Sequence, residues 1–353
     1  MISDGSIAVS IVVACRNEIA HIRRFLDSLF AQEIGGLQWE AVIADGMSTD
    51  GTREVLDEYA QTHREVRVVL NPGRIVSTGL NTAIRAARGR YILRFDAHSY
   101  YAPDYCRKCI EALEATGADN AGGPARTQVS GILGRAIAAA YHSRFSTGGA
   151  HFHDETFEGW VDTVPYGCWR KETLERVGMF DEALVRNQDD ELNLRIVRAV
   201  GRIWQSPAIV SWYSPRSTLS TLFRQYFQYG FWKVMVIRKH RLPGSWRHLV
   251  PITFVVANII LLVCIALAAA TRATVLFEFF ALWLMMLGAY MLASLTASVL
   301  AARRAGWETL FYLPVVFAAY HLSYGTGFLA GLCFWFRHTT ALPQDSIFSR
   351  ISR

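Results

Sequence analysis

Carboxylate side chains recur at four places in the first 200 residues, each after a short apolar run or at a predicted helix start. These places are Glu18, Asp45, Asp96 and the segment 188–191 (Gln-Asp-Asp-Glu). Carboxylates can bind a divalent cation, accept hydrogen bonds from a base or a ribose, or act as a general base. Each of them alone is also an ordinary turn or helix-start residue. Their meaning therefore depends on whether the fold brings them together.

Two of these places have a specific chemical reading. His98 follows Asp96 by two residues, and a carboxylate and an imidazole at this spacing in an extended segment can bind one divalent cation together with phosphate oxygens. The segment 188–191 places three carboxylates at a predicted helix start, where acids also favour the helix dipole. One of the three is a candidate general base.

The elements that must position these residues alternate along the first 115 residues. Strands are predicted at 7–14, 40–44, 66–70 and 91–95, and helices at 19–30, 50–59, 77–87 and 103–115. Such alternation predicts an α/β fold with a mostly parallel sheet. Ligands bind at the carboxyl ends of parallel strands. Asp45 and Asp96 both follow a strand, so we expect them at that edge.

The region from 122 to 212 is less regular. The patterns predict a helix over 132–145, a short strand over 161–166 and a helix over 189–199. His151 and His153 lie in a loop rich in Gly, His and aromatic residues, where packing is a commoner role than ligand binding. A long helix over 219–240 carries many aromatic and basic residues. This pattern is typical of an interfacial membrane helix, although a helix packed on the domain would also fit.

Composition changes sharply at Leu249. From there to the end, 105 residues contain six Lys or Arg and three Asp or Glu, whereas the first 248 residues contain thirty and 27. The apolar stretches 249–271, 274–300 and 309–336 each exceed the roughly 20 residues that a membrane-spanning helix needs. We therefore predict a catalytic-sized domain at 1–216, an interfacial segment at 217–248, a transmembrane region at 249–336 and a tail at 337–353.

Charge gives an expected orientation. The first two stretches form a hairpin with Arg272 at its tip, and Arg303 and Arg304 lie on the return side, the side of the N-terminal domain. The third stretch either spans or re-enters, and its glycines at 327 and 331 also suit a close helix contact. If it spans, Arg337 lies on the opposite side, against the positive-inside rule.

Several classes are disfavoured. A net charge of +6 is weak evidence for nucleic acid, and basic residues beside a membrane region suit anionic lipid better. The six cysteines have no framework or zinc-site spacing, which favours reduced thiols in cytoplasm. Residues 1–10 contain no Lys or Arg and do not resemble a signal peptide, so the domain is expected inside the cell.

The ordered set of motifs resembles the family 2 glycosyltransferases with the GT-A fold, a Rossmann-like, mostly parallel sheet. The resemblance extends from residue 7 to about residue 233. Its motifs here are Asn17-Glu18, DGMSTDGT at 45–52, NTAIRAARGRYILRFDAH at 81–98, GMFDE at 178–182 and NQDDELNLR at 187–195. The C-terminal apolar region, with HLSYGTG at 321–327, is similar to the membrane-bound branch that builds bacterial exopolysaccharides of the succinoglycan type.

This resemblance implies roles on the donor side. Glu18 and Asp45 would hold the donor nucleotide, with Asp45 at the uracil edge, and Arg74 would contact base or phosphate. Asp96 and His98 stand at the DxD motif of the family, where they would bind the donor and a divalent metal, Mn²⁺ or Mg²⁺. His98 departs from the usual second Asp, and imidazole suits Mn²⁺ better than Mg²⁺.

On the acceptor side, Asp189 matches the catalytic base of the family and implies a single displacement with inversion. Processive synthases of the family carry QxxRW, whereas residues 225–229 here read Gln-Tyr-Phe-Gln-Tyr. We therefore expect one sugar per acceptor. Arg224, Gln225 and Lys233 are candidate contacts for an acceptor or a lipid diphosphate, and both cations also suit an ordinary interfacial role.

The resemblance implies transfer of a sugar from a UDP-linked donor to a polyprenyl-linked saccharide at the inner face of a bacterial plasma membrane. A polyprenyl-phosphate sugar synthase is the first alternative, because an ionised phosphate acceptor needs no base. A membrane transport subunit with a nucleotide-sensing domain is the second. The near absence of ionisable residues in the apolar stretches argues against a transport pathway.

Overall fold

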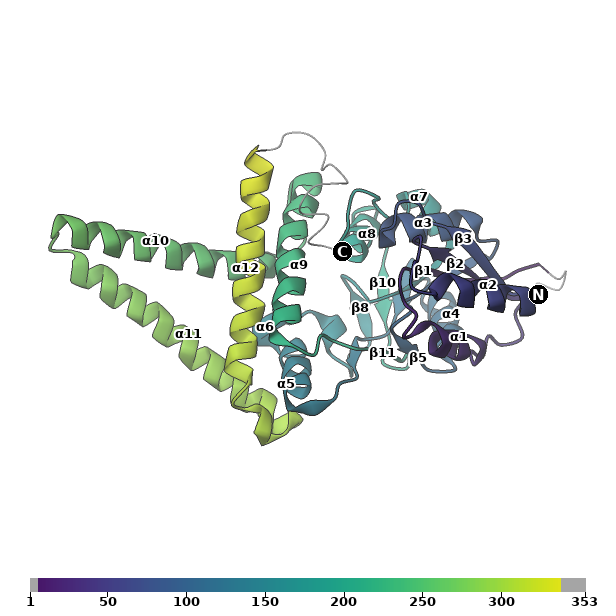
Figure 1. The fold of residues 1–353 in the computed structure, drawn as a ribbon, viewed down its shortest axis with the longest axis horizontal. Helices are drawn as coiled ribbons and strands as arrows, with labels where there is room; N and C mark the ends of the chain where they lie inside the picture. Colours follow the sequence, from purple (N-terminus) through teal and green to yellow (C-terminus); the bar gives the residue numbers. More distant parts are fainter. Residues whose placement is uncertain (1–5, 338–353) are drawn as a thin grey trace. The chain divides into compact units, whose positions relative to one another are not determined.

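The computed structural model describes residues 6–337, which form two compact units (Figure 1). The first unit comprises the residues up to Gln128 together with His151–Ser214, and the second comprises Val129–Ala150 together with the residues from Pro215 on. This division differs from the contiguous domain 1–216 expected from the sequence. Val129–Ala150 leaves the first unit because its helix buries apolar side chains among the C-terminal helices.

The first unit is built on a mostly parallel sheet with the strand order β3-β2-β1-β4-β9-β6-β10-β8. Its strands are β1 Val9–Cys15, β2 Trp39–Asp45, β3 Val66–Leu70, β4 Tyr91–Phe95, β6 Asn120–Gly122, β8 Gly159–Val161, β9 Cys168–Arg170 and β10 Ile203–Gln205. The strand β1 pairs in parallel with β2 and β4, and β2 pairs in parallel with β3. In contrast, β9 is antiparallel to both of its neighbours. A small second sheet has the order β5-β11-β7, with β5 Tyr100–Tyr101, β7 Arg126–Thr127 and β11 Ser211–Tyr213.

Helices cover both faces of the main sheet. They are α1 Ile22–Phe30, α2 Thr52–Thr62, α3 Val76–Ala86, α4 Tyr105–Thr116, α7 Lys171–Val177 and α8 Gln188–Arg198. Because side chains alternate along a strand, Ile11 and Val13 of β1 enter a core with α1, α2 and α4, while Val12 enters another with α3, α7 and α8. Burial on both faces of β1, β2 and β4 explains why apolar residues predominate in these strands. The predicted α/β class is confirmed.

The four N-terminal strands agree with the sequence prediction, but the middle region does not. The strand predicted at 161–166 is wrong, since β8 ends at Val161 and β9 begins at Cys168. The additional strands β5, β6, β7, β10 and β11 contain two or three residues each. Such lengths are too short for an alternating pattern to be recognised.

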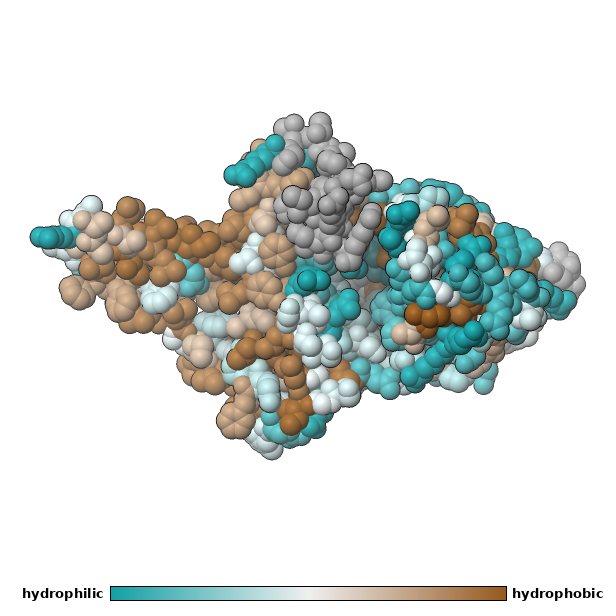
Figure 2. Space-filling model, in the orientation of Figure 1, coloured by the Kyte–Doolittle hydropathy of each residue, from teal (hydrophilic) through white to brown (hydrophobic). Residues whose placement is uncertain are grey.

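The second unit is helical. Its elements are α5 Gly131–Tyr141, α6 Arg144–Thr147, α9 Leu219–His240, α10 Val250–Thr271, α11 Leu276–Ala305 and α12 Leu313–Arg337, with short 3₁₀ turns at Trp246–Leu249 and Trp307–Thr309. Three helices, α10 to α12 with the turn before α10, are long and apolar enough to cross a membrane. Apolar side chains dominate the surface of α10 and α11 (Figure 2).

Small residues set the closest helix contact of this unit. A Cβ atom at Gly230 of α9 would collide with the backbone of Tyr324, and one at Gly327 of α12 would collide with the backbone of Phe227. At Gly331 it would lie 2.8 Å from the carbonyl oxygen of Phe231. The spacing of the glycines at 327 and 331 suited a close helix contact, and the structure shows that they form one with α9.

Within the first unit, Glu40 of β2 is a buried charge held by several donors. Its carboxylate accepts hydrogen bonds from Ser10 Oγ at 2.9 Å, Arg67 Nη1 at 3.0 Å and Arg88 Nη2 at 2.9 Å. Burial alone would raise the pKa of Glu40, but the hydrogen bonds from Arg88, Ser10 and Arg67 lower it below the ordinary value. The carboxylate therefore links β1, β2, β3 and the segment before β4.

Replacing this carboxylate by an amide should destabilise the first unit. We expect Glu40→Gln to lower the thermal midpoint of the detergent-solubilised chain by about 5 °C at pH 7, from a loss of about 2 kcal/mol. Because the folded-state pKa is lowered, this stabilisation is present above the unfolded-state pKa and is lost as pH falls through the folded-state pKa. The difference between variant and wild type should therefore shrink below about pH 4.

The matched control is Glu58→Gln, which removes an exposed partner of Arg23. Exposed pairs contribute little, so its thermal midpoint should change by less than about 1 °C. A Glu40→Gln difference that stays constant between pH 7 and pH 3.5 would contradict the assignment.

Candidate functional site

The carboxyl ends of β1 to β4 meet at one edge of the main sheet. Cys15 lies opposite Asp45, Asp45 lies opposite Leu70, and Val13 of β1 lies opposite Phe95. The segments that leave these strands therefore start from the same edge. The expected placement of Asp45 and Asp96 at this edge is confirmed.

Backbone hydrogen bonds fix the two loops that follow β1 and β2. Asn17 N–H donates to Ser48 Oγ at 3.0 Å, and Thr49 N–H donates to the side-chain oxygen of Asn17 at 2.9 Å. Glu18 N–H donates to Thr52 Oγ1 at 2.8 Å. Asn17 adopts a positive φ of 56°, a conformation that asparagine tolerates better than most residues. The position of Glu18 is therefore set by the loop after β2.

Asp45 lies beneath this loop. Its side chain is only 2 % exposed, and its two oxygens accept from Ser48 N–H at 3.2 and 3.3 Å. Arg53 Nη1 lies 3.8 Å from the same carboxylate. Arg74 is exposed in the loop after β3 and has a φ of 59°. Asp45 thus supports the shape of the loop, and the base contacts of Asp45 and Arg74 stay predictions.

Three predicted residues meet above the sheet edge. His98 Nδ1 lies 3.1 Å from Asp96 Oδ1 and 3.5 Å from Glu18 Oε1. The three side chains are 20 to 40 % exposed, so a ligand can reach them. Asp96 N–H donates to the hydroxyl oxygen of Tyr101 at 2.7 Å. Burial raises the pKa of Tyr101 well above its ordinary value, so the phenol stays neutral.

The chemistry of this cluster suits a divalent cation. Asp96 and Glu18 offer oxygen ligands and His98 offers an imidazole nitrogen, a mixed set more typical of Mn²⁺ than of Mg²⁺. Among the described residues, no group of three or more His, Cys, Asp or Glu is arranged as a complete metal site. A cation here would therefore need further ligands, for which diphosphate oxygens are suitable.

Asp189 is held by a residue that sequence reasoning missed. Arg94 Nη1 forms an ion pair with Asp189 Oδ1 in the first turn of α8. The Arg94 side chain is 7 % exposed and that of Asp189 is 35 % exposed. Burial alone would lower the pKa of Arg94, but the carboxylates of Asp189 and Asp96 raise it above its ordinary value, so the guanidinium stays charged. The available signal was one arginine inside the otherwise apolar strand Tyr91–Phe95.

Aromatic side chains support the segment between Asp96 and β5. The ring of Phe95 stacks on that of Tyr101 with centroids 3.7 Å apart. Ser99 Oγ and the hydroxyl of Tyr166 are 2.7 Å apart and hydrogen-bonded. These contacts fix the turn that carries Asp96 and His98, and composition alone did not identify them.

The tentative acceptor residues lie on α9 of the second unit. Gln225 donates to the hydroxyl oxygen of Tyr229 at 2.9 Å. Arg224 is exposed, whereas Lys233 is only 5 % exposed. Nine residues separate them, which places the two cations on opposite sides of the helix. They therefore do not form one joint binding site.

The two loop histidines pack on aromatic rings. His151 stacks on Phe157 with ring centroids 4.1 Å apart, and His153 contacts Phe152 at 4.0 Å. Gln205 of β10 donates to the carbonyl oxygens of His151 and Phe157 at 3.2 and 3.3 Å. These contacts agree with the packing role favoured for both histidines.

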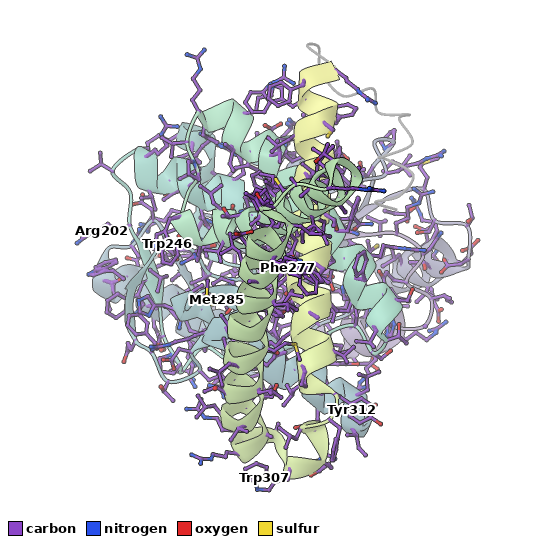
Figure 3. All side chains as sticks on the ribbon, turned by 90° about the vertical axis from the view of Figure 1, so that its left-hand side faces the viewer. Arg202, Trp246, Phe277, Met285, Trp307 and Tyr312 are labelled. Atoms are coloured by element: carbon purple, nitrogen blue, oxygen red, sulfur yellow. The ribbon has the colours of Figure 1, made fainter. Side chains whose placement is uncertain are left out.

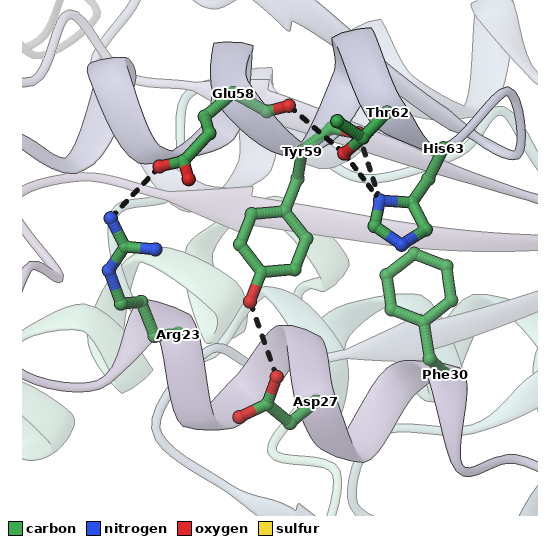
Figure 4. A pocket seen from close by; sticks show the side chains of 7 residues that line it. All are labelled: Arg23, Asp27, Phe30, Glu58, Tyr59, Thr62 and His63. Carbon is green, nitrogen blue, oxygen red and sulfur yellow. Dashed lines mark hydrogen bonds and ion pairs between the residues drawn. The ribbon is translucent and has the colours of Figure 1, made fainter.

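A separate pocket of about 420 Å³ lies between α1 and α2 (Figure 4). Its lining side chains are Arg23, Asp27, Phe30, Glu58, Tyr59, Thr62 and His63. Arg23 pairs with Glu58 at 2.9 Å and the Tyr59 hydroxyl donates to Asp27 at 3.2 Å, so its charged groups satisfy one another. It contains none of the predicted site residues.

Comparison with known proteins identifies the family of the chain. Residues 10–160 match the family Glycosyl transferase family 2. The succinoglycan biosynthesis protein ExoA of Rhizobium meliloti is 35 % identical over 244 residues, which cover 69 % of this chain and 74 % of ExoA. A Methanococcus voltae protein is 27 % identical over 263 residues, covering 72 % of this chain and 81 % of its own length. Its name is dolichyl N-acetyl-alpha-D-glucosaminyl phosphate 3-beta-D-2,3-diacetamido-2,3-dideoxy-beta-D-glucuronosyltransferase.

A solved structure supports the fold. The mannosyltransferase PcManGT from Pyrobaculum calidifontis, in complex with GDP-Man and Mn²⁺, superposes with a TM-score of 0.55 at 20 % identity. The match covers 91 % of this chain and 86 % of PcManGT. The predicted GT-A architecture is thereby confirmed, and the transport-subunit alternative is set aside. The chain is a glycosyltransferase and belongs to glycosyl transferase family 2.

Proposed function

We propose that this glycosyltransferase moves one sugar from a nucleotide donor, UDP-linked, to a lipid-linked saccharide, with inversion and with the help of a divalent metal. The observation that carries the proposal is that the end of β4 positions both the Asp96–His98 cluster and, through Arg94, the carboxylate of Asp189. Asp96 and His98 lie two and four residues beyond Arg94, and Arg94 holds Asp189. A donor-binding cluster and a candidate base thus depend on the same strand.

On the donor side, Glu18, Asp45 and Arg74 would hold the nucleotide. Glu18 is partly exposed beside His98, and Asp45 shapes the loop from Gly46 to Thr49. Arg74 supplies a cation from the loop after β3. Asp96 and His98 would hold Mn²⁺ or Mg²⁺, which when bound neutralises charge on the departing nucleoside diphosphate.

On the acceptor side, Asp189 would take the proton from the attacking hydroxyl. Arg94 binds one of its carboxylate oxygens, and the side chain keeps 35 % of its surface exposed, so a hydroxyl can reach it. The hydroxyl would attack the anomeric carbon from the face opposite the departing diphosphate, and such a single displacement inverts the configuration. No covalent intermediate is needed. The polyprenyl-phosphate alternative does not require this base.

The acceptor class and location are supported by relatives and by the apolar helices. The name of the Rhizobium meliloti relative refers to succinoglycan biosynthesis, and that of the Methanococcus voltae relative refers to a dolichyl-linked sugar phosphate. We infer a role in exopolysaccharide synthesis at the bacterial plasma membrane, with a multi-pass membrane region and the catalytic unit in the cytoplasm. Arg303 and Arg304 at the end of α11 suit that orientation. The segment 225–229 lacks Arg-Trp, which favours addition of one sugar.

The base assignment predicts a specific loss. Asp189→Asn should reduce nucleotide release in the presence of lipid acceptor by about 10³-fold, because the amide cannot take the proton. UDP binding, measured by calorimetry on the solubilised chain, should change little. The matched control is Asp190→Asn, which alters the neighbouring carboxylate and should keep most activity. Unaltered turnover of Asp189→Asn would favour the polyprenyl-phosphate alternative.

Arg94 should act as a positioning residue. Arg94→Met should lower kcat by about 10 to 10²-fold with little change in the KM of the donor, because the base loses its fixed position. Arg94→Lys should recover part of that loss, since a cation returns without the fork of the guanidinium. Arg85→Met, which removes an exposed partner of Glu182, is the control. Loss of UDP binding in parallel with kcat would instead indicate a general folding defect.

The metal assignment is testable at His98. Chelation with EDTA should abolish nucleotide release, and Mn²⁺ should restore it better than Mg²⁺. His98→Asp should raise the ratio of Mg²⁺-supported to Mn²⁺-supported activity by about tenfold, because carboxylate is the harder ligand. Mn²⁺ binding followed by electron paramagnetic resonance should weaken in Asp96→Asn. Full activity after exhaustive chelation would rule the metal out.

A further inference from the structure

Within residues 6–337, three helices are long and apolar enough to cross a membrane, but α12 is packed differently from α10 and α11. Half of the most apolar 18-residue window of α12 is buried inside the protein, compared with 17 % for α10 and none for α11. Helices surrounded by lipid expose apolar side chains on most sides. The burial values therefore suit α10 and α11 as lipid-exposed spans and set α12 apart.

The helix α12 runs beside α9 over most of its length. Facing ring or cation pairs follow one another in the same direction along both helices, from Tyr226–Tyr320 through Phe231–Phe334 to Arg238–Trp335. Gly230, Gly327 and Gly331 allow close backbone approach between them. The two helices thus form a parallel pair, named here the α9–α12 pair.

In contrast, α12 crosses α10 (Figure 1). A Cβ atom at Gly325 would lie 2.6 Å from the carbonyl oxygen of Pro251. Further along α12, Phe328 and Trp335 still belong to the cluster around Ile252 and Val256 of α10. From residue 325 to 335 α12 advances about 15 Å, whereas residues 251–256 of α10 extend only about 8 Å. A membrane-spanning α12 packed alongside α10 would instead contact successive turns of α10 beyond residue 256.

The composition of α9 argues against its insertion across the bilayer. Its 22 residues include Arg224, Lys233, Arg238 and Lys239, and it is not apolar enough to be a candidate span. Charged side chains in the hydrocarbon core are costly. Because α12 is packed along α9, a membrane-spanning α12 would carry these cations with it.

The outer face of the α9–α12 pair suits a membrane surface. Val315, Leu322 and Phe336 of α12 recur at multiples of seven residues and are 55, 41 and 79 % exposed. Trp246 before α10, and Trp307 and Tyr312 after α11, are exposed aromatic residues typical of the interface (Figure 3). Arg303 and Arg304 add exposed positive charge at the end of α11, which complements anionic headgroups.

We propose that, of the helices described here, only α10 and α11 cross the membrane and that the α9–α12 pair lies along the anionic lipid surface on the side where α10 begins. Residues 6–337 then cross the membrane twice, and Arg303, Arg304 and Arg337 lie on one side. This arrangement agrees with the positive-inside rule, which a third crossing would violate at Arg337. The proposal concerns the lipid contacts of the second unit and does not depend on the reaction.

Cysteine labelling in sealed membrane vesicles tests the proposal with the full chain. A Cys264→Ser, Cys333→Ser background removes the two cysteines that are not buried and keeps the buried Cys15, Cys106, Cys109 and Cys168. Each variant then receives one exposed cysteine, by Thr274→Cys, Phe311→Cys or Arg337→Cys. A membrane-impermeant maleimide is added before or after permeabilisation. We expect Phe311→Cys and Arg337→Cys to react in the same step, and Thr274→Cys at the hairpin turn to react in the other.

Every other pattern overturns the proposal. Reaction of Arg337→Cys in the same step as Thr274→Cys would show that α12 crosses the membrane. Reaction of all three cysteines in one step would show that the α10–α11 hairpin does not cross it. Each variant is first checked for wild-type thermal midpoint in detergent. Glycosylation-site insertion at the same three positions provides a second readout that does not depend on thiol accessibility.

Discussion

A guanidinium inside a buried strand must be paired, and the pairing of Arg94 with Asp189 links β4 to the first turn of α8. These residues are 95 positions apart in the sequence, so the ion pair fixes a relation that local structure cannot provide. Asp96 follows Arg94 by two residues and also contributes to the field that keeps the guanidinium charged. The candidate base and the candidate donor cluster are therefore positioned from one strand. The loops after β1 and β2 complete that arrangement by placing Glu18 beside His98.

The sequence predicted the parts of the fold that carry strong periodic signals. The strands β1 to β4 are mostly apolar, so their existence, their parallel pairing and the position of Asp45 and Asp96 followed from pattern alone. The later strands have two or three residues and gave no such signal. For this reason a strand was predicted over 161–166, although β8 ends at Val161. Val129–Ala150 was assigned to the catalytic domain because a contiguous chain gives no sign that one segment packs elsewhere.

The candidate site shows the same limit. Residue type and spacing singled out Glu18, Asp96, His98 and the acidic segment 188–191 as candidates, and the family resemblance singled out Asp189 within that segment. These side chains occupy partly exposed positions at strand and helix ends. The partner of Asp189 could not be found, because an ion pair between distant elements leaves no mark in local spacing. Arg224 and Lys233 were grouped by proximity in sequence, yet the helical period places them on opposite faces. Burial then distinguishes them further, since only Lys233 is enclosed.

The most direct test of the proposed reaction is the stereochemistry of its product. Purified full-length chain would be incubated with Mn²⁺, a membrane lipid extract and an α-linked UDP-sugar selected from a donor panel. The anomeric configuration of the lipid-linked product would then be determined by nuclear magnetic resonance. Single displacement assisted by Asp189 predicts a β-linked product and release of UDP only when donor and lipid acceptor are both present. An α-linked product would contradict this account.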